Sequence, residues 1–267
     1  MQTISEGPVL VARDGATARI TFNRPEKKNA VSNQMLRTVI AALEEASVDE
    51  EIRSILLTGQ GDYFSSGRDI KDFDSAKADG DTSPPSVPSL FMQALTGLLE
   101  SPKPTIAAVR GFALGGGQAI SLACDFLVAE RTARFGNVEM AYGFPAAMNI
   151  ALLSRHLGRR LALEIAITGE LYGAERYWEL GLVNRLANPG ELEAVTDEFV
   201  NLLNSREPWA VRRTKQTFRM AEQATEQGAM HLGDELNHLL FNGRSRSVHS
   251  GSGAAKDSIK KGIGDTT

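Results

Sequence analysis

A glycine triplet that follows a strand-like run is the feature that most constrains the fold of this chain. Residues 105–109, Thr-Ile-Ala-Ala-Val, have the apolar, β-branched character of a buried strand, and Gly115-Gly116-Gly117 lies shortly after them. Because glycine has no Cβ, the first N–H groups of the next helix, at about 116–123, stay open to a ligand. The pattern predicts a strand–loop–helix unit that presents backbone N–H groups to an anion or a carbonyl oxygen.

Strand and helix patterns alternate through the first half of the chain. Residues 9–11 and 18–22 predict a hairpin that turns at Asp14-Gly15. The helix that follows has an apolar row of Met35, Val39 and Leu43, and Ser32 or Asn33 can cap it. Further strands are expected at 54–58, 105–109 and 126–129, with helices at 90–100 and 116–123 between them. This order predicts right-handed crossovers and a largely parallel sheet, and therefore an α/β fold.

The second half of the chain is predicted to be almost wholly helical. Glycine and proline separate the expected helices, which lie at about 146–157, 159–167, 174–180, 191–204, 208–226 and 229–240. We expect an α/β core over 1–190 and a helical C-terminal region over 191–267 that ends in a flexible tail from Gly243. Residues 74–89 have little to bury and are expected to form a mobile loop.

Composition excludes several classes of function. The net charge of −4 argues against nucleic-acid binding, which needs a basic surface. No apolar run approaches the roughly 20 residues that span a membrane, and the first residues do not resemble a secretory signal. The single cysteine, Cys124, rules out an intrachain disulfide, and the four scattered histidines offer no metal site. A cytoplasmic protein without a metal is the expectation.

Candidate chemistry comes from one carboxylate and two loops. Residues 66–68, Ser-Gly-Arg, form a second loop that can present backbone amides, and Glu139 is a candidate general base. A base beside converging N–H donors is the minimum set of groups for making and stabilising an enolate. The structural alternatives are that the triplet only permits tight helix–strand packing, and that Glu139 is a capping or surface carboxylate.

Four motifs in order resemble the crotonase (enoyl-CoA hydratase/isomerase) superfamily. The resemblance covers roughly residues 8–240, and its motifs lie at 21–25 with 29–31, 64–71, 111–117 with 123–125, and 135–139. It implies a crotonase-like spiral of ββα units with a helical C-terminal region that serves for trimerisation. It also implies a homotrimer or homohexamer that acts on an acyl-CoA thioester.

The resemblance assigns roles to individual residues. The amides of Arg68 and Gly116 would form an oxyanion hole, and Glu139 would be the acid/base. The path of coenzyme A would be lined by two segments, which contribute Lys28, Ala30, Ser66, Arg68, Asp69, Ile70 and Lys71, with Gly116 at its end. No tightly bound cofactor is implied, since coenzyme A enters as part of the substrate. The long side chain of Arg68 is expected to point toward solvent or toward the mouth of the acyl pocket.

The departures from the family pattern bear on the reaction. Hydratases of this superfamily use two glutamates, and the position of the first is Ala119 here. A double-bond shift from 3-enoyl-CoA to 2-enoyl-CoA needs one base only, so the sequence favours an isomerase. A hydratase, or another single-carboxylate lyase or hydrolase, remains the alternative, and a non-enzymatic acyl-CoA-binding relative is the third. Residues 145–149, Pro-Ala-Ala-Met-Asn, also differ from the glycine-richer and longer segment of many hydratases.

Overall fold

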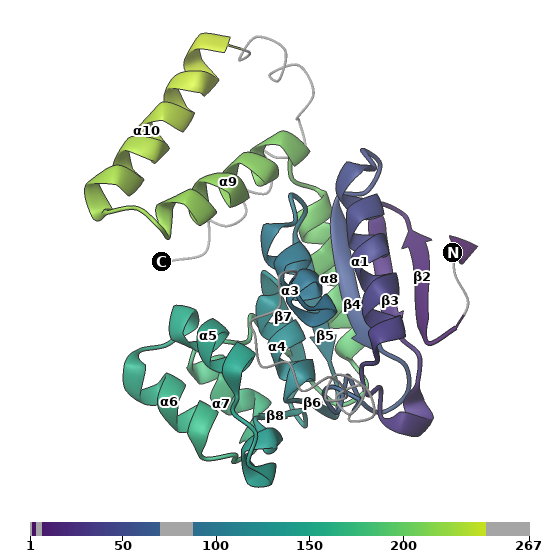
Figure 1. Ribbon diagram of the computed structural model, residues 1–267. Helices are drawn as coiled ribbons and strands as arrows, with labels where there is room; N and C mark the ends of the chain where they lie inside the picture. Colours follow the sequence, from purple (N-terminus) through teal and green to yellow (C-terminus); the bar gives the residue numbers. More distant parts are fainter. Residues whose placement is uncertain (1, 4–6, 70–87, 244–267) are drawn as a thin grey trace, which may run out of the picture. The chain divides into compact units, whose positions relative to one another are not determined.

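The computed structural model describes residues 2–3, 7–69 and 88–243 (Figure 1). The chain divides into two compact units, Met1–Pro208 and Trp209–Thr267. The loop expected at 74–89 lies, up to residue 87, outside the described residues, as does the expected tail beyond Gly243.

A seven-stranded sheet with strand order β1-β2-β3-β4-β5-β7-β10 forms the centre of the first unit (Figure 1). β2 pairs antiparallel with β3, which confirms the predicted hairpin, and β3, β4, β5, β7 and β10 run parallel. The strands of this sheet are β1 (Gln2–Thr3), β2 (Val9–Asp14), β3 (Thr17–Phe22), β4 (Ser54–Gly59), β5 (Thr105–Val109), β7 (Phe126–Glu130) and β10 (Arg185–Ala187). The expectation of an α/β fold with a largely parallel sheet is therefore confirmed.

Both faces of the sheet are buried, so its central strands are apolar at consecutive positions. Ile55 and Leu57 of β4 join the larger hydrophobic core, whereas Leu56 between them joins a smaller core on the opposite face. The larger core receives side chains from α1 (Asn33–Val48), α3 (Leu90–Glu100) and α4 (Gly116–Ala123), and the smaller one from α8 (Leu192–Asn204). In α1 the predicted apolar row is buried, and the Ser32 hydroxyl caps the helix by accepting from the Met35 N–H at 3.2 Å.

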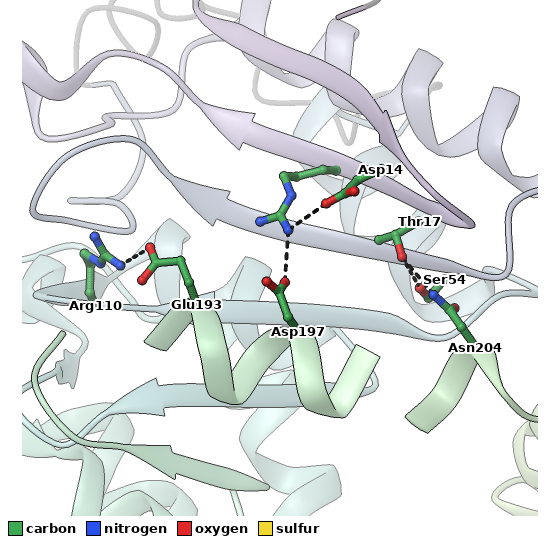
Figure 2. A network of polar contacts seen from close by, with 8 residues as sticks. Asp14, Thr17, Ser54, Arg110, Glu193, Asp197 and Asn204 are labelled. Carbon is green, nitrogen blue, oxygen red and sulfur yellow. Dashed lines mark hydrogen bonds and ion pairs between the residues drawn. The ribbon is translucent and has the colours of Figure 1, made fainter. Parts of the chain in front are cut away.

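Polar contacts attach α8 to the sheet, and Figure 2 shows them along its length. Arg19 of β3 pairs with Asp197 at 3.1 Å, Arg110 pairs with Glu193, and the Asn204 amide donates to the Thr17 hydroxyl at 2.9 Å. Together with the buried Phe199 and Val200, these contacts make α8 part of the first unit. The apolar face of α8 packs back onto the sheet within this unit, and the expected division of the chain at 190 stays a prediction.

A small second sheet, β6-β8-β9, joins the glycine-rich segment to the segment that carries Glu139. The sequence pattern does not predict these strands, because each is only two or three residues long. Its strands are β6 (Phe112–Leu114), β8 (Arg134–Gly136) and β9 (Tyr172–Gly173). The helices that follow are α5 (Ala147–His156), α6 (Arg159–Ile167) and α7 (Ala174–Glu179), close to their predicted bounds.

The described part of the second unit is helical. α9 (Pro208–Ala221) begins at the boundary, and α10 (Glu226–Gly243) follows it. Phe218 and Met230 are largely exposed on these helices. The trimerisation role of the C-terminal region stays a prediction. None of the described helices combines the length and the apolar composition that a membrane span requires.

Candidate active site

The glycine triplet forms the start of α4. Gly115 is its N-cap residue at φ +49°, a conformation that side chains rarely adopt, and the helix begins at Gly116. The first N–H groups of an α-helix have no acceptor within the helix, so the Gly116 amide is available to a ligand by its position. A Cβ on Gly116 would lie 3.2 Å from the backbone nitrogen of Arg68. The two predicted oxyanion donors thus belong to neighbouring loops that approach as closely as glycine permits.

Short strand-like contacts hold the two loops against each other. Ser65 and Ala113 form a parallel bridge, in which Ser65 N–H donates to the Phe112 carbonyl at 3.1 Å and Leu114 N–H donates to Ser65 at 3.0 Å. Gly67, at φ +108°, brings the chain past this bridge, and a Cβ there would be 3.4 Å from the Gly116 nitrogen. The spacing between the Arg68 and Gly116 amides is therefore set by backbone pairing rather than by side chains.

The side chain of Arg68 contacts residues of α1 and α3. Its guanidinium donates to Asn33 Oδ1 at 2.9 Å and stacks over the Phe91 ring at 5.1 Å. Arginine favours such contacts because its planar, delocalised cation packs on aromatic faces while it donates at its edge. The side chain packs against α1 and α3 instead of extending toward solvent.

Glu139 lies next to the helix start, on the short helix η3 (Val138–Tyr142). A Cβ on Gly115 would be 2.8 Å from Glu139 Oε2, so only glycine fits between the carboxyl and the backbone here. Oε1 accepts from the Asn149 amide at 3.2 Å, whereas Oε2 is buried and no donor among the described residues reaches it. Burial raises the pKa of Glu139, and a backbone N–H and the Asn149 amide partly oppose this.

Glu139→Gln is expected to stabilise the fold at neutral pH. The folded protein holds the carboxyl proton more tightly than the unfolded chain, whose glutamate pKa is about 4.3. The wild type therefore loses stability as pH rises from the unfolded-state pKa through the folded-state pKa. Glutamine does not ionise, so its advantage in the free energy of unfolding should be smallest at acidic pH and grow toward neutrality, as urea unfolding at several pH values would measure.

Glu170→Gln is the matched control for this prediction, because Glu170 is an exposed glutamate of the same region. Its substitution should change the unfolding free energy little. A flat pH profile for Glu139→Gln would contradict the raised pKa of Glu139.

The residues expected along the coenzyme A path come together where the structure describes them. The Ser66 N–H donates to the Lys28 carbonyl at 2.9 Å, and Arg68 forms a bridge with Val31 just after Ala30. Asp69 accepts an ion pair from Arg24 at 2.9 Å, and Arg24 also donates to the Ala30 carbonyl at 2.8 Å. Ile70 and Lys71 lie outside the described residues. The binding role of this surface stays a prediction.

Three further positions shape the surroundings of Glu139. Ala119 is fully buried in the larger core, so α4 presents a methyl group at the position where a hydratase would have its first glutamate. Tyr142 and Phe144, on the other side of Glu139 in the sequence, are 78% and 53% exposed.

Sequence reasoning missed the polar residues behind Glu139. Asn149, Gln118 and Tyr177 are buried and hydrogen-bonded to one another in series. The available signal was weak: Asn149 ends the 145–149 segment that departs from the family pattern, and Gln118 interrupts an otherwise small and apolar helix.

Elsewhere, the described residues contain no group of three or more His, Cys, Asp or Glu arranged to hold a metal ion.

Comparison with known proteins agrees with this geometry. The family described as enoyl-CoA hydratase/isomerase matches residues 12–254. The chain belongs to this family. It is 32% identical to the short-chain-enoyl-CoA hydratase of Clostridium acetobutylicum, over 85% of this chain and 87% of the relative. It is likewise 32% identical to the 2,3-dehydroadipyl-CoA hydratase of Escherichia coli K12, over 87% and 89%.

Solved structures extend the likeness to three dimensions. A crystal structure of an enoyl-CoA hydratase from Polaromonas sp. JS666 superimposes with a TM-score of 0.83 at 28% identity and covers 96% of this chain and 98% of that one. The crotonase resemblance and the crotonase-like fold expected from the motifs are thereby confirmed.

Proposed function

We propose that this protein is a crotonase-superfamily enzyme that isomerises 3-enoyl-CoA to 2-enoyl-CoA, with Glu139 as its only acid/base. One observation carries the proposal: a single carboxyl group, that of Glu139, lies against the start of α4 at Gly115, and its buried Oε2 accepts no hydrogen bond from a described residue. The position at which a hydratase has its other carboxylate is the buried Ala119. Proton transfer by one group fits this arrangement better than a reaction that divides its proton transfers between two groups.

The reaction balances with these groups alone. The Glu139 carboxylate removes a proton from C2, and the electrons of that C–H bond form a dienolate whose charge collects on the thioester oxygen. The N–H groups of Arg68 and Gly116 stabilise that charge, a contribution that is typically about 3 kcal/mol for each donor. The protonated Glu139 then returns the proton at C4, which leaves the double bond between C2 and C3. Neither water nor a redox step enters.

The raised pKa of Glu139 suits this shuttle. The raised pKa makes the Glu139 carboxylate a stronger base toward the C2 proton, and the same group, once protonated, is the acid that delivers the proton to C4. The substrate carries coenzyme A itself, with Lys28, Ala30, Ser66, Asp69 and the adjoining residues proposed along its path. No tightly bound cofactor is part of the proposal.

Hydration of a 2-enoyl-CoA is the second candidate, and the names of the relatives favour it. Two relatives of 32% identity are a short-chain-enoyl-CoA hydratase and a 2,3-dehydroadipyl-CoA hydratase. A single carboxylate would then have to activate water and deliver the C2 proton in turn. Other single-carboxylate reactions, lyase or thioester hydrolase, share the same oxyanion hole.

Isotope labelling separates these candidates. We expect purified protein, given a 3-enoyl-CoA in water enriched in ¹⁸O, to form the conjugated 2-enoyl thioester without incorporating ¹⁸O. Mass spectrometry of the product and the absorbance of the conjugated thioester measure the two quantities. In a parallel reaction with a 2-enoyl-CoA, label in a 3-hydroxyacyl-CoA would instead identify hydration, and label in a free acid would identify hydrolysis. Tight acyl-CoA binding without turnover across a panel of chain lengths would identify a binding protein.

The assembly and the location of the protein complete the proposal. We expect a homotrimer or homohexamer built through the C-terminal region, in the cytoplasm, acting on an acyl-CoA thioester. Light scattering of the purified protein measures the number of subunits directly.

A further inference from the structure

A buried chain of side-chain amides leads from the interior of the first unit to Glu139. The Tyr177 hydroxyl donates to Gln118 Oε1 at 3.0 Å, Gln118 Nε2 donates to Asn149 Oδ1 at 3.3 Å, and Asn149 ends the chain. All three residues are at most 2% exposed. Buried polar groups of this kind are expensive unless every donor finds an acceptor, so the arrangement is strongly specified.

Chemistry fixes which way each amide points. Asn137 Nδ2 donates to the Ile165 carbonyl at 2.8 Å, so its Oδ1 faces Gln118 and must receive a donor. Burial raises the pKa of Tyr177, so its O–H remains a donor toward Gln118 Oε1. Gln118 therefore presents its NH₂ group to Asn137 and Asn149 together. Asn149 must then accept this hydrogen bond with its Oδ1, so its own NH₂ group points away from Gln118.

The two N–H bonds of the Asn149 amide donate to two parts of the candidate active site, the glycine loop and the Glu139 carboxyl. One goes to the Gly115 carbonyl at 2.9 Å and the other to Glu139 Oε1 at 3.2 Å. A flipped Asn149 would set its oxygen against two acceptors, which excludes that orientation. An asparagine amide has only these two donors, so both are used at the site.

We propose that Asn149 is a positioning residue that aligns the oxyanion donor and the base with each other. This inference rests on the proposed function, in which the Gly116 N–H binds the thioester oxygen and Glu139 moves the proton. Asn149 touches neither the oxygen nor the reacting carbons. It acts through the Gly115–Gly116 peptide on one side and through the Glu139 carboxylate on the other.

The peptide unit gives the first half of the mechanism. The Gly115 carbonyl and the Gly116 N–H belong to one planar trans peptide and point in opposite directions, so fixing the carbonyl fixes the N–H. The same carbonyl accepts from the Ala119 N–H at 3.0 Å, so Asn149 adds a second, side-chain donor to the one that the helix supplies. A hydrogen bond to the carbonyl also polarises the same peptide and makes its N–H a stronger donor.

The carboxylate gives the second half. With Oε1 held by Asn149, the rotation of the Glu139 carboxyl is restricted, and Oε2 is the oxygen left to exchange a proton with substrate. The groups around this carboxyl are Asn149, the Gly115 backbone and a backbone N–H of η3, and no charged neighbour contributes to its pKa among the described residues. Removing Asn149 should therefore affect Glu139 through that one hydrogen bond.

The kinetic test compares Asn149→Leu with Tyr177→Phe. Leucine has a similar size but no donors, and we expect kcat to fall by about 10- to 100-fold while KM stays nearly constant, because only alignment in the transition state is lost. Tyr177→Phe removes one buried hydrogen bond from the far end of the same network. It should lower stability without lowering kcat, because Asn137 Oδ1 still holds the Gln118 amide in the same orientation. This difference separates positioning from a merely structural role. Wild-type kcat in a folded Asn149→Leu protein would overturn the proposal.

A second variant keeps the kinetic test decisive if the leucine variant does not fold. Asn149→Asp retains the size and the oxygen that faces Gln118, but sets an oxygen against the Gly115 carbonyl and Glu139. We expect it to lose at least as much kcat as the leucine variant. An aspartate variant with wild-type kcat would equally overturn the proposal.

A third measurement needs no turnover and so distinguishes this inference from the proposed function. The stabilisation gained by Glu139→Gln at neutral pH should be larger in an Asn149→Leu background, because the charged carboxylate has lost its hydrogen bond. Equal stabilisation in both backgrounds would overturn the Asn149 assignment even for a protein that turns over no enoyl-CoA. If turnover is absent but this coupling is present, the proposed function fails and the positioning of Glu139 by Asn149 stands.

Discussion

Glu139→Gln is expected to lower kcat for the isomerisation of a 3-enoyl-CoA by about 10³-fold, the middle of the range for a general acid/base. Glutamine keeps the size of the side chain and the oxygen that accepts from Asn149, but it cannot take or return a proton. The buried Oε2 becomes an NH₂ group. Because substrate contacts remain in place, KM should change little, and steady-state kinetics measures both constants.

The stability of the same variant provides an internal control. It should be at least as stable as the wild type at neutral pH, so that a loss of activity cannot be attributed to unfolding. Glu170→Gln, at an exposed position, should retain full activity. Turnover of the Glu139→Gln protein at the wild-type rate would remove Glu139 from the mechanism.

Gly115→Ala is expected to lower kcat by about 10²-fold or more, since displacing a reacting group by about 1 Å has an effect of that size. The new methyl group would be 2.8 Å from Glu139 Oε2, closer than carbon and oxygen approach without repulsion. Either the carboxyl rotates away from the substrate or the loop moves and carries the Gly116 N–H with it. The φ of +49° adds backbone strain, so the unfolding free energy should also fall.

Gly143→Ala is the control that separates the steric clash with Glu139 from the backbone strain. Gly143 also has a positive φ, +76°, but a Cβ there would meet nothing within 4 Å. It should reduce stability to a similar degree through its backbone alone, while activity remains close to that of the wild type. Equal losses of activity in the two alanine variants would mean that strain, rather than contact with Glu139, explains the effect.

Glu139→Gln and Gly115→Ala test the same contact, one by changing the carboxyl and the other by changing the backbone beside it. Glu139 is set in surroundings that raise its pKa and disfavour its charged form, so the carboxylate is held at some expense of folding free energy. Asn149 and the Gly115 backbone limit where that carboxylate can lie. A functional group that destabilises the fold and is nonetheless tightly surrounded is typical of active sites.

Much of the fold was predictable because local pattern and global packing agree. The consecutive apolar residues Ile55, Leu56 and Leu57 predicted a strand, and their side chains divide between the two cores. The row of Met35, Val39 and Leu43 predicted a helix with one buried face, and all three are buried. Glycine and proline marked helix ends that lie within a few residues of the observed ones.

What escaped prediction depends on contacts between distant segments. Strands β6 and β8 are three residues each and exist because β8 pairs with both β6 and β9. The direction of the Arg68 side chain depends on Asn33 and Phe91, which come from two other helices. The place of α8 depends on its fit to the far face of the sheet, which composition alone does not reveal.

The sequence by itself determined the strand–glycine–helix unit, the single candidate base Glu139 and the absence of a carboxyl at 119, because backbone freedom and side-chain chemistry are properties of single residues. Only the tertiary structure decided that Glu139 lies against Gly115 and that Asn149 bridges the two. The hydrogen bonds concerned join residues 10 and 34 positions apart in the chain. Their directions follow from how α4, η3 and α5 pack, and no local pattern encodes that packing.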